Sequence, residues 1–222
     1  MNEKRKIKAR VAGSLTVTAV MLVAAIVLFA SIKSIAHEWR EDEAAQRENE
    51  ILRELARSQM QQSDALGTVT KERESVNFDA LFAVNPNVVG WIYLSGSAID
   101  YPIVQGRDNI HYLYHAFSGA QNTSGAIFLD YRDNPDFSGQ ARIYGHNVRN
   151  GTKFGFLANW SGYDIVIHTP DAKLRYTVIW RGILHISEVV GLSDAGLMLI
   201  TCVRATPEVR YVVIGERRHI DV

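Results

Sequence analysis

The hydrophobic residues of this chain follow three different patterns. Residues 11–32 form a run of 22 positions without a charged side chain. Residues 36–66 contain no glycine or proline and are rich in charged side chains. From Phe78 onward, short apolar runs alternate with turn residues. In this order the patterns predict an apolar helix, a polar helix and a β-rich domain.

The apolar run is long enough to cross a membrane. As a helix it would span roughly 33 Å, which matches the hydrocarbon core of a bilayer. Basic residues crowd positions 4–10, and basic flanks stay cytoplasmic. We therefore predict a cytoplasmic basic segment over 1–10, a transmembrane anchor over 11–32 and an extracellular remainder. A cleavable signal peptide is the alternative, but Lys33 stands where small residues would precede cleavage.

The polar helix carries oppositely charged residues three or four positions apart, which supports a helix. These pairs are Glu43/Arg47, Glu50/Arg53 and Glu54/Arg57. Its large apolar residues are too few for a sustained heptad, although a weak dimer contact is an alternative. We predict a solvated helical stalk and a linker over 33–75, followed by a separate catalytic domain over 76–222.

The remaining apolar runs are short and rich in β-branched and aromatic residues. They cover residues 88–94, 98–104, 125–129, 141–144, 165–169, 174–180, 196–201 and 210–215. Turn signals such as Asn85-Pro86 and Ser95-Gly96 separate them. This pattern predicts a mainly β fold, either a barrel or a sandwich. We expect short helices near 78–84, 109–113 and 153–157.

The net charge and the single cysteine limit the classes of function that the chain can have. The formal net charge is zero, so the chain gives no sign of a nucleic-acid partner. Cys202 is the only cysteine, which excludes an internal disulfide. Its thiol is therefore a buried bystander, an intermolecular link or a reactive group. The sequence has no metal-ligand cluster and no cofactor fingerprint, so we expect neither a metal nor a cofactor.

Three segments carry candidate chemistry. Residues 142–147 form a strand and a glycine turn that presents His146, and residues 199–202 form a strand that ends on Cys202. Residues 210–214 form a strand that begins with Arg210, and antiparallel pairing would make this cation a neighbour of the thiol. Cysteine, histidine and arginine together suit acyl transfer, as nucleophile, acid/base and oxyanion stabiliser. Arg204 is the rival cation, and we expect it to point into its own loop.

At these residues the sequence resembles a sortase, and specifically a class B sortase. The matching motifs lie at residues 85–92, 99–105, 108–113, 124–132, 144–147, 150–154 and 201–202. The resemblance implies a closed eight-stranded sortase-type barrel with short helices. It also implies a membrane-anchored enzyme that cleaves a C-terminal sorting signal of secreted proteins after Thr. A cysteine thioester would then pass the acyl group to a peptidoglycan precursor or another cell-wall amine.

The resemblance also assigns residues to roles. It places the catalytic groups at His146, Cys202 and Arg210. It suggests that a substrate groove touches Asn109, Leu113, Tyr144 and Thr201. Leu113 is alternatively a core residue, and Asn109 is alternatively the cap of a short helix.

Some features depart from class B, and other functions stay open. The 181–194 segment is shorter than the helical insert usual before the cysteine strand, and Ile200 and Val203 are unusual beside the cysteine. The alternatives are a pilin-polymerising sortase and a cysteine endopeptidase without transfer. A further alternative is a membrane-anchored interaction module in which Cys202 is buried and inert.

Overall fold

The computed structural model describes residues 3–57, 76–191 and 196–218. The chain divides into two compact units, Met1–Glu43 and Ala44–Val222. The second unit contains a β-barrel and the residues that we predict to carry the chemistry.

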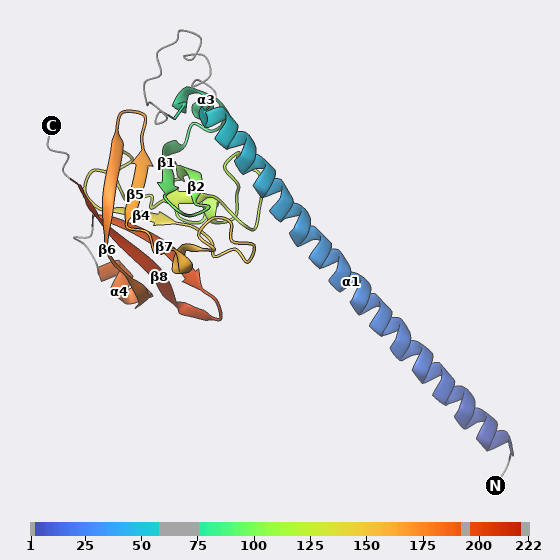
Figure 1. The fold of residues 1–222 in the computed structure, drawn as a ribbon. Helices are drawn as coiled ribbons and strands as arrows, with labels where there is room; N and C mark the ends of the chain where they lie inside the picture. The colour runs from blue at the N-terminus through green and yellow to red at the C-terminus, as the bar shows by residue number, and fades with distance from the viewer. Residues whose placement is uncertain (1–2, 58–75, 192–195, 219–222) are drawn as a thin grey trace. The chain divides into compact units, whose positions relative to one another are not determined.

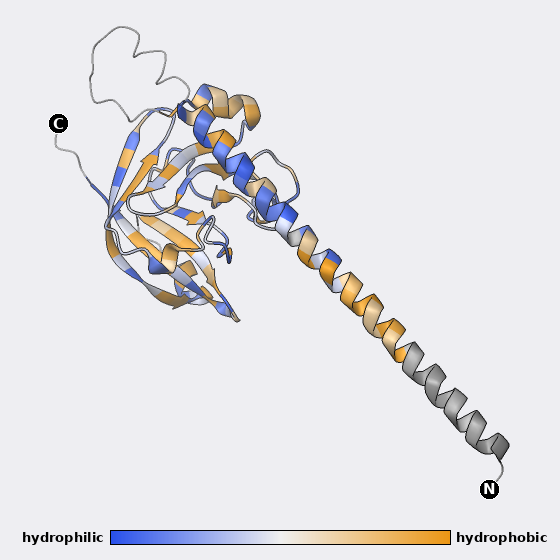
Figure 2. Ribbon diagram, turned by 45° about the vertical axis from the view of Figure 1, so that its right-hand side comes forward, coloured by the Kyte–Doolittle hydropathy of each residue, from blue (hydrophilic) through white to orange (hydrophobic). Residues whose placement is uncertain are grey.

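The first helix, α1 (Glu3–Arg57), covers both the apolar run and the polar stretch that follows it. In Figure 2 its colour changes from orange to blue along the described chain, as the residues become hydrophilic. From Val20 onward it is long and apolar enough to cross a membrane, judged by length and composition alone. A signal sequence near the N-terminus would pass the same test, so membrane anchoring stays a prediction.

The end of α1 packs against the barrel, which differs from the predicted solvated stalk. Four residues on one helical face are buried: Ala45, Asn49, Leu52 and Ala56. Their spacing of four, three and four positions makes a continuous stripe. The stripe consists largely of small and polar residues, so a search for large apolar side chains overlooks it. Residues 58–75, the rest of the predicted stalk and linker, lie outside the described residues.

The contacts of this segment are both apolar and polar. Leu52 and Ala56 share a hydrophobic cluster with Phe78 and Leu81 of helix α3 (Phe78–Val84), which lies beside the end of α1 (Figure 1). Arg57 Nη2 pairs with an Asp100 carboxylate oxygen at 2.7 Å. We refer to residues 44–57 as the strap.

Eight strands close into the barrel that the sequence predicts (Figure 1). They are β1 (Val88–Leu94), β2 (Asp100–Gln105), β3 (Ile127–Leu129), β4 (Ala141–Tyr144), β5 (Asp164–His168), β6 (Lys173–His185), β7 (Leu197–Val203) and β8 (Thr206–Arg217). Their order around the barrel is β1-β2-β3-β4-β7-β8-β6-β5. The β2–β3 and β4–β7 pairs are parallel, and the other pairs are antiparallel.

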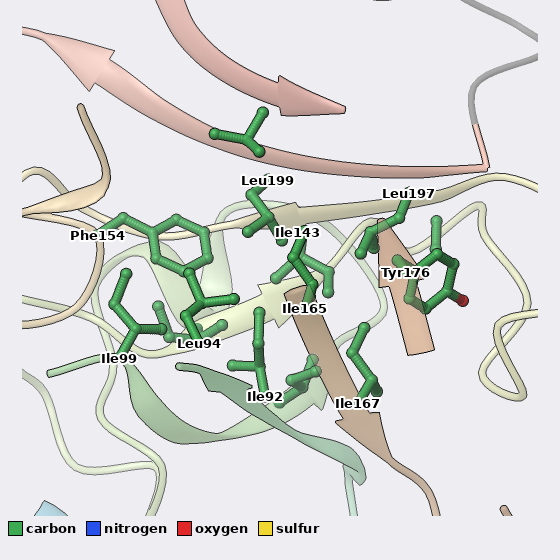
Figure 3. Packing of buried hydrophobic residues seen from close by; sticks show 14 of the residues in the cluster. Ile92, Leu94, Ile99, Ile143, Phe154, Ile165, Ile167, Tyr176, Leu197 and Leu199 are labelled. Carbon is green, nitrogen blue, oxygen red and sulfur yellow. The ribbon is translucent and has the colours of Figure 1, made fainter. Parts of the chain in front are cut away.

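Alternate side chains of the strands fill the barrel, because successive residues of a strand point to opposite faces. Figure 3 shows Ile143, Ile165, Leu197 and Leu199 converging on this interior, and all four are fully buried. This core holds β4 and β7 firmly side by side, and both strands lead to candidate catalytic residues.

Short helices connect the strands. The predicted helix at 78–84 is α3, whose Asn77 side chain accepts a hydrogen bond from Ala80 N as an N-cap. The 109–113 prediction corresponds to the 3₁₀ turn η2 (His111–Leu113). The third helix lies at η3 (Leu157–Asn159), later than predicted, because Lys153 has a positive φ of 54° that a right-handed helix excludes. Helix α4 (Ile186–Gly191), in the short segment before β7, was not predicted.

Candidate active site

Cys202 and Arg210 are register partners on the antiparallel strands β7 and β8. Directly opposed residues of such a pair point to the same face of the sheet. The neighbourhood predicted from the antiparallel pairing is therefore confirmed. The Cys202 thiol is exposed, which removes the premise of the alternative with a buried, inert cysteine.

A bulge in β8 shapes the position of Arg210. Val203 pairs with Thr206 while Cys202 pairs with Arg210, so residues 207–209 are extra residues in the β8 strand. Pro207 fits there because a bulge does not need its missing N–H.

The bulge also holds the Arg210 side chain. The Arg210 Nη1 donates to the carbonyl oxygens of Pro207 (2.7 Å) and Val209 (2.8 Å). Both hydrogen bonds described for this guanidinium involve Nη1. They hold the guanidinium in place, and Nε and Nη2 remain as donors for a substrate.

Cys202 lies on the outer face of the barrel wall. Leu199 belongs to the barrel core, whereas Ile200 belongs to a separate cluster with Val189 of α4. Cys202 shares the face of Ile200, because side chains alternate along a strand. Tyr144 pairs with Ile200 across β4 and β7 and packs against the same cluster. Tyr144 and α4 therefore border the surface on which the thiol lies.

His146 lies two residues after the end of β4, in a turn that requires the glycine before it. A Cβ at Gly145 would come within 2.5 Å of Ile127 Cδ1 and 2.7 Å of the Phe154 ring. The imidazole Nε2 lies 2.8 Å from the Leu113 carbonyl oxygen. A carbonyl only accepts hydrogen bonds, so Nε2 carries a hydrogen and Nδ1 is the basic nitrogen of the neutral ring.

Leu113 therefore supplies its backbone to the site. Its side chain is partly buried against the cluster that also contains Tyr112 and Leu52 of the strap. The sequence treats Leu113 as a groove residue or a core residue, and the structure adds a contact with His146 that no side-chain pattern indicates. Asp108 accepts hydrogen bonds from the backbone of Ile110 and His111, so it, and not Asn109, caps this turn.

Thr201 is 2% exposed, and its side chain lies on the face opposite Cys202. Its Oγ1 donates to the Gly145 carbonyl oxygen at 2.7 Å. The hydroxyl that we predicted to touch a substrate is thus buried and donates its hydrogen bond within the fold. The sequence missed this because a strand register is needed to decide which way residue 201 points.

Arg204 does not point away into its own loop, contrary to our expectation. Its Nη2 donates to the Asn147 carbonyl oxygen at 3.4 Å, a long hydrogen bond that leads to the turn after His146. Arg204 is exposed, and it lies in the two-residue turn between β7 and β8. Both arginines thus belong to the surroundings of Cys202, but only Arg210 is its register partner.

Asp130, which the sequence analysis did not single out, is a buried acceptor of several hydrogen bonds next to the site. It is fully buried and accepts hydrogen bonds from Arg132 (2.9 and 2.8 Å) and from Asn109 Nδ2 (2.9 Å). Burial alone would raise the pKa of its carboxyl, but these hydrogen bonds and the charge of Arg142 hold it well below its usual range. Asp130 is therefore an ionised acceptor at neutral pH.

Two predicted groove residues form hydrogen bonds with Asp130. The Tyr144 hydroxyl donates to Asp130 Oδ2 (3.2 Å), and burial and that carboxylate raise the pKa of Tyr144 to about 12. Asn109 Oδ1 accepts from Tyr131 N (3.1 Å) while its Nδ2 bonds Asp130. The signal for this arrangement is an aspartate directly after a buried strand, with an arginine two residues on.

Comparison with known proteins agrees with this geometry. A sortase domain model matches residues 92–218, more than half of the chain. The chain therefore belongs to the sortase family, and its relatives identify it as class B-like. Sortase B of Listeria monocytogenes is 33% identical over 116 residues, which cover 48% of this chain and 47% of that protein. The chain spans about half the length of the curated relatives it matches.

Solved sortase structures share the fold. A Streptococcus pyogenes class B sortase involved in pilus biogenesis is 26% identical, with a TM-score of 0.56 over 64% of this chain and 98% of its own. A Staphylococcus aureus sortase B–substrate complex has a TM-score of 0.63 at 22% identity, over 82% of this chain and 100% of its own. At that identity the likeness concerns the fold alone.

Proposed function

We propose that this protein is a cysteine transpeptidase that cleaves a C-terminal sorting signal of secreted proteins after Thr. The acceptor of the acyl group would be an amine of the cell wall or of a peptidoglycan precursor. The observation that carries this proposal is that the exposed Cys202, near the end of a buried strand, is in register with Arg210 on the neighbouring strand. A nucleophile and a cation in register suit attack on a carbonyl group.

In the first half-reaction the Cys202 thiolate attacks the carbonyl carbon of the Thr residue. Negative charge develops on the carbonyl oxygen, and the Arg210 donors stabilise it. The C–N bond then breaks, and the leaving amine takes a proton from His146. Because Nε2 is engaged by the Leu113 carbonyl, Nδ1 is the atom that delivers this proton.

The second half-reaction reverses the proton transfer. His146 Nδ1 accepts a proton from the incoming amine, which attacks the thioester carbonyl. The C–S bond breaks, the new amide forms, and Cys202 leaves as a thiolate. The cycle consumes no oxidant and needs no metal-bound water.

Among the predicted groove residues, we propose Tyr144 and Leu113 as those that border the bound peptide. Tyr144 lies beside Ile200 on the outer face, and the Leu113 carbonyl holds His146. Asn109 and Thr201 would act behind this surface, because their polar groups already bond Asp130 and Gly145.

Product analysis with and without an added amine tests the function. Transfer predicts a new amide between the Thr carboxyl and the amine, at the expense of the free acid. An endopeptidase would release only the free acid at every amine concentration. The likeness to a sortase involved in pilus biogenesis favours one further candidate, a pilin-polymerising enzyme. Its acceptor would be a lysine side chain of a second protein, and competition between a lysine peptide and a cell-wall amine separates the two.

We also propose that residues 11–32 anchor the enzyme, with the N-terminus in the cytoplasm and the catalytic unit outside. The basic flank and the apolar helix support this orientation. A protease added to intact protoplasts should then degrade the barrel. Protection of the barrel, with degradation after lysis, would contradict the orientation.

A further inference from the structure

The pairing between β4 and β7 ends just before the two proposed catalytic residues. The last register pair is Tyr144 with Ile200, followed by one backbone hydrogen bond from Gly145 N to Ile200 O (3.2 Å). His146 and Cys202 each lie two residues beyond that last pair. Backbone pairing therefore stops where the spacing of the two strands matters for the reaction.

Two side chains continue the connection past this point. From β7, Thr201 Oγ1 donates to Gly145 O (2.7 Å), and from the β4 turn, Asn147 Nδ2 donates to Cys202 O (2.9 Å). The contacts are reciprocal, since each segment donates once and accepts once. Because Cys202 O only accepts, the amide group facing it must be the NH₂ of Asn147.

The turn itself is held from its other side. Asn147 forms an isolated β-bridge with Lys153, and Phe154 N donates to the His146 carbonyl oxygen (3.0 Å). Arg204 reaches the Asn147 carbonyl, as described above. These contacts fix the backbone of Asn147, and its side chain then holds the Cys202 carbonyl near the end of β7.

We propose that Asn147 is a positioning residue, which holds Cys202 in register with His146 through the cysteine's own carbonyl. This inference rests on the proposed function, because it concerns the geometry of thiol and imidazole during acyl transfer. A displacement of about 1 Å in reacting groups can cost on the order of 10²-fold in rate. The thiol is exposed at a strand end, so a tether on its backbone restricts it without covering it.

The test compares Asn147→Ala with Asn147→Asp in peptide cleavage and amine transfer. Alanine removes the donor, whereas aspartate keeps the shape and places a negative oxygen against the Cys202 carbonyl. We expect kcat to fall on the order of 10-fold or more for alanine and further for aspartate, with KM within about 2-fold of wild type. The melting temperature of both variants should stay near that of wild type.

A role in packing alone predicts the opposite order, since aspartate preserves the volume of the side chain. Asn134 provides a matched control, because its Nδ2 donates to the Ser138 carbonyl (3.1 Å) at the other end of β4. Asn134→Ala and Asn134→Asp should leave kcat unchanged. Asn147 variants with wild-type kcat, or with losses that follow their loss of folded protein, would overturn this inference while the wild type stays active. A wild type that neither cleaves nor transfers would instead overturn the proposed function.

Discussion

His146 Nε2 lies 2.8 Å from the carbonyl oxygen of Leu113, a residue 33 positions earlier in the chain. This contact fixes the tautomer of the proposed acid/base and attaches it to the η2 turn. The same stretch of backbone is approached from behind by Gly125. A Cβ there would lie 2.6 Å from Leu113 O and 2.7 Å from Tyr112 O.

Gly125→Ala should therefore displace the partner of His146. Gly125 has a φ of 56°, so alanine also costs about 1–2 kcal/mol in this left-handed region. We expect turnover to fall on the order of 10-fold or more, together with a loss of stability. Gly139→Ala is the control, because Gly139 has a φ of 81° and its Cβ would meet no atom of the described residues within 4 Å. Equal activity losses in the two variants would show that strain, and not the Leu113 carbonyl, is responsible.

Arg210→Lys should be far more harmful than Arg204→Lys. Lysine cannot reproduce the fork by which Arg210 bonds its bulge with Nη1 and leaves other donors for an oxyanion. We expect turnover to fall by about 10² or more, comparable to loss of one oxyanion donor. Among the described residues Arg204 makes one long hydrogen bond, so it should tolerate lysine. Steady-state kinetics on one peptide decides, and the reverse ranking would identify Arg204 as the stabilising cation.

Leu52 and Ile51 are neighbours on the strap with opposite environments, at 2% and 56% exposure. Leu52→Ala should destabilise the protein by about 2–4 kcal/mol, because it removes buried apolar volume. Ile51→Ala should stay within about 0.5 kcal/mol of wild type. Urea unfolding of a chain that begins at Ala44 measures both. Two neutral substitutions would mean that the strap is a solvated stalk after all.

Lys153 predicts a pH dependence of stability. Burial lowers its pKa to about 8, from an ordinary value of 10.5, although Glu48 acts in the opposite direction. Below pH 8 the folded protein carries the full cost of a buried charge. Between pH 8 and 10.5 the unfolded chain holds a proton that the folded chain has released, so stability rises with pH.

Lys153→Met removes this titration. Methionine is also unbranched at Cβ, so the backbone at position 153 should be similar in the two proteins. Relative to that variant, wild type should gain roughly 3 kcal/mol of unfolding free energy as pH rises through this window. Urea unfolding at several pH values measures the difference. A constant offset between the two proteins would show that the ammonium is not desolvated in the folded state.

The sequence predicts the strands well because their evidence is local, whereas the closed barrel comes from the resemblance to sortases. Short apolar runs rich in β-branched and aromatic residues mark the strands, and turn residues separate them. The strands that carry Cys202 and Arg210 follow from the same evidence, but β8 begins at Thr206, four residues before the predicted start at Arg210. Their register also follows, in outline, because the hairpin between them is short.

The strap and the supports of the site depend on contacts between distant segments. Ala45, Asn49 and Ala56 become a packing face only when a barrel is present to receive them. Which face of β7 points into the barrel decides whether the Thr201 hydroxyl faces substrate or core, and that face follows only from the strand's packing. The role of the Leu113 carbonyl leaves no sequence signal, because every residue has a backbone carbonyl. Such contacts follow only from the three-dimensional arrangement of the chain.

The central claim is that Cys202 forms a thioester with the Thr carbonyl of a sorting signal. The most direct measurement is intact-protein and peptide-map mass spectrometry after mixing the purified full chain with a pool of Thr-containing sorting peptides, without an amine. We expect one acyl adduct on Cys202, released on addition of an amine and absent from the Cys202→Ala variant. Peptide cleavage by the Cys202→Ala variant, or cleavage by wild type with an adduct on another residue, would contradict the account.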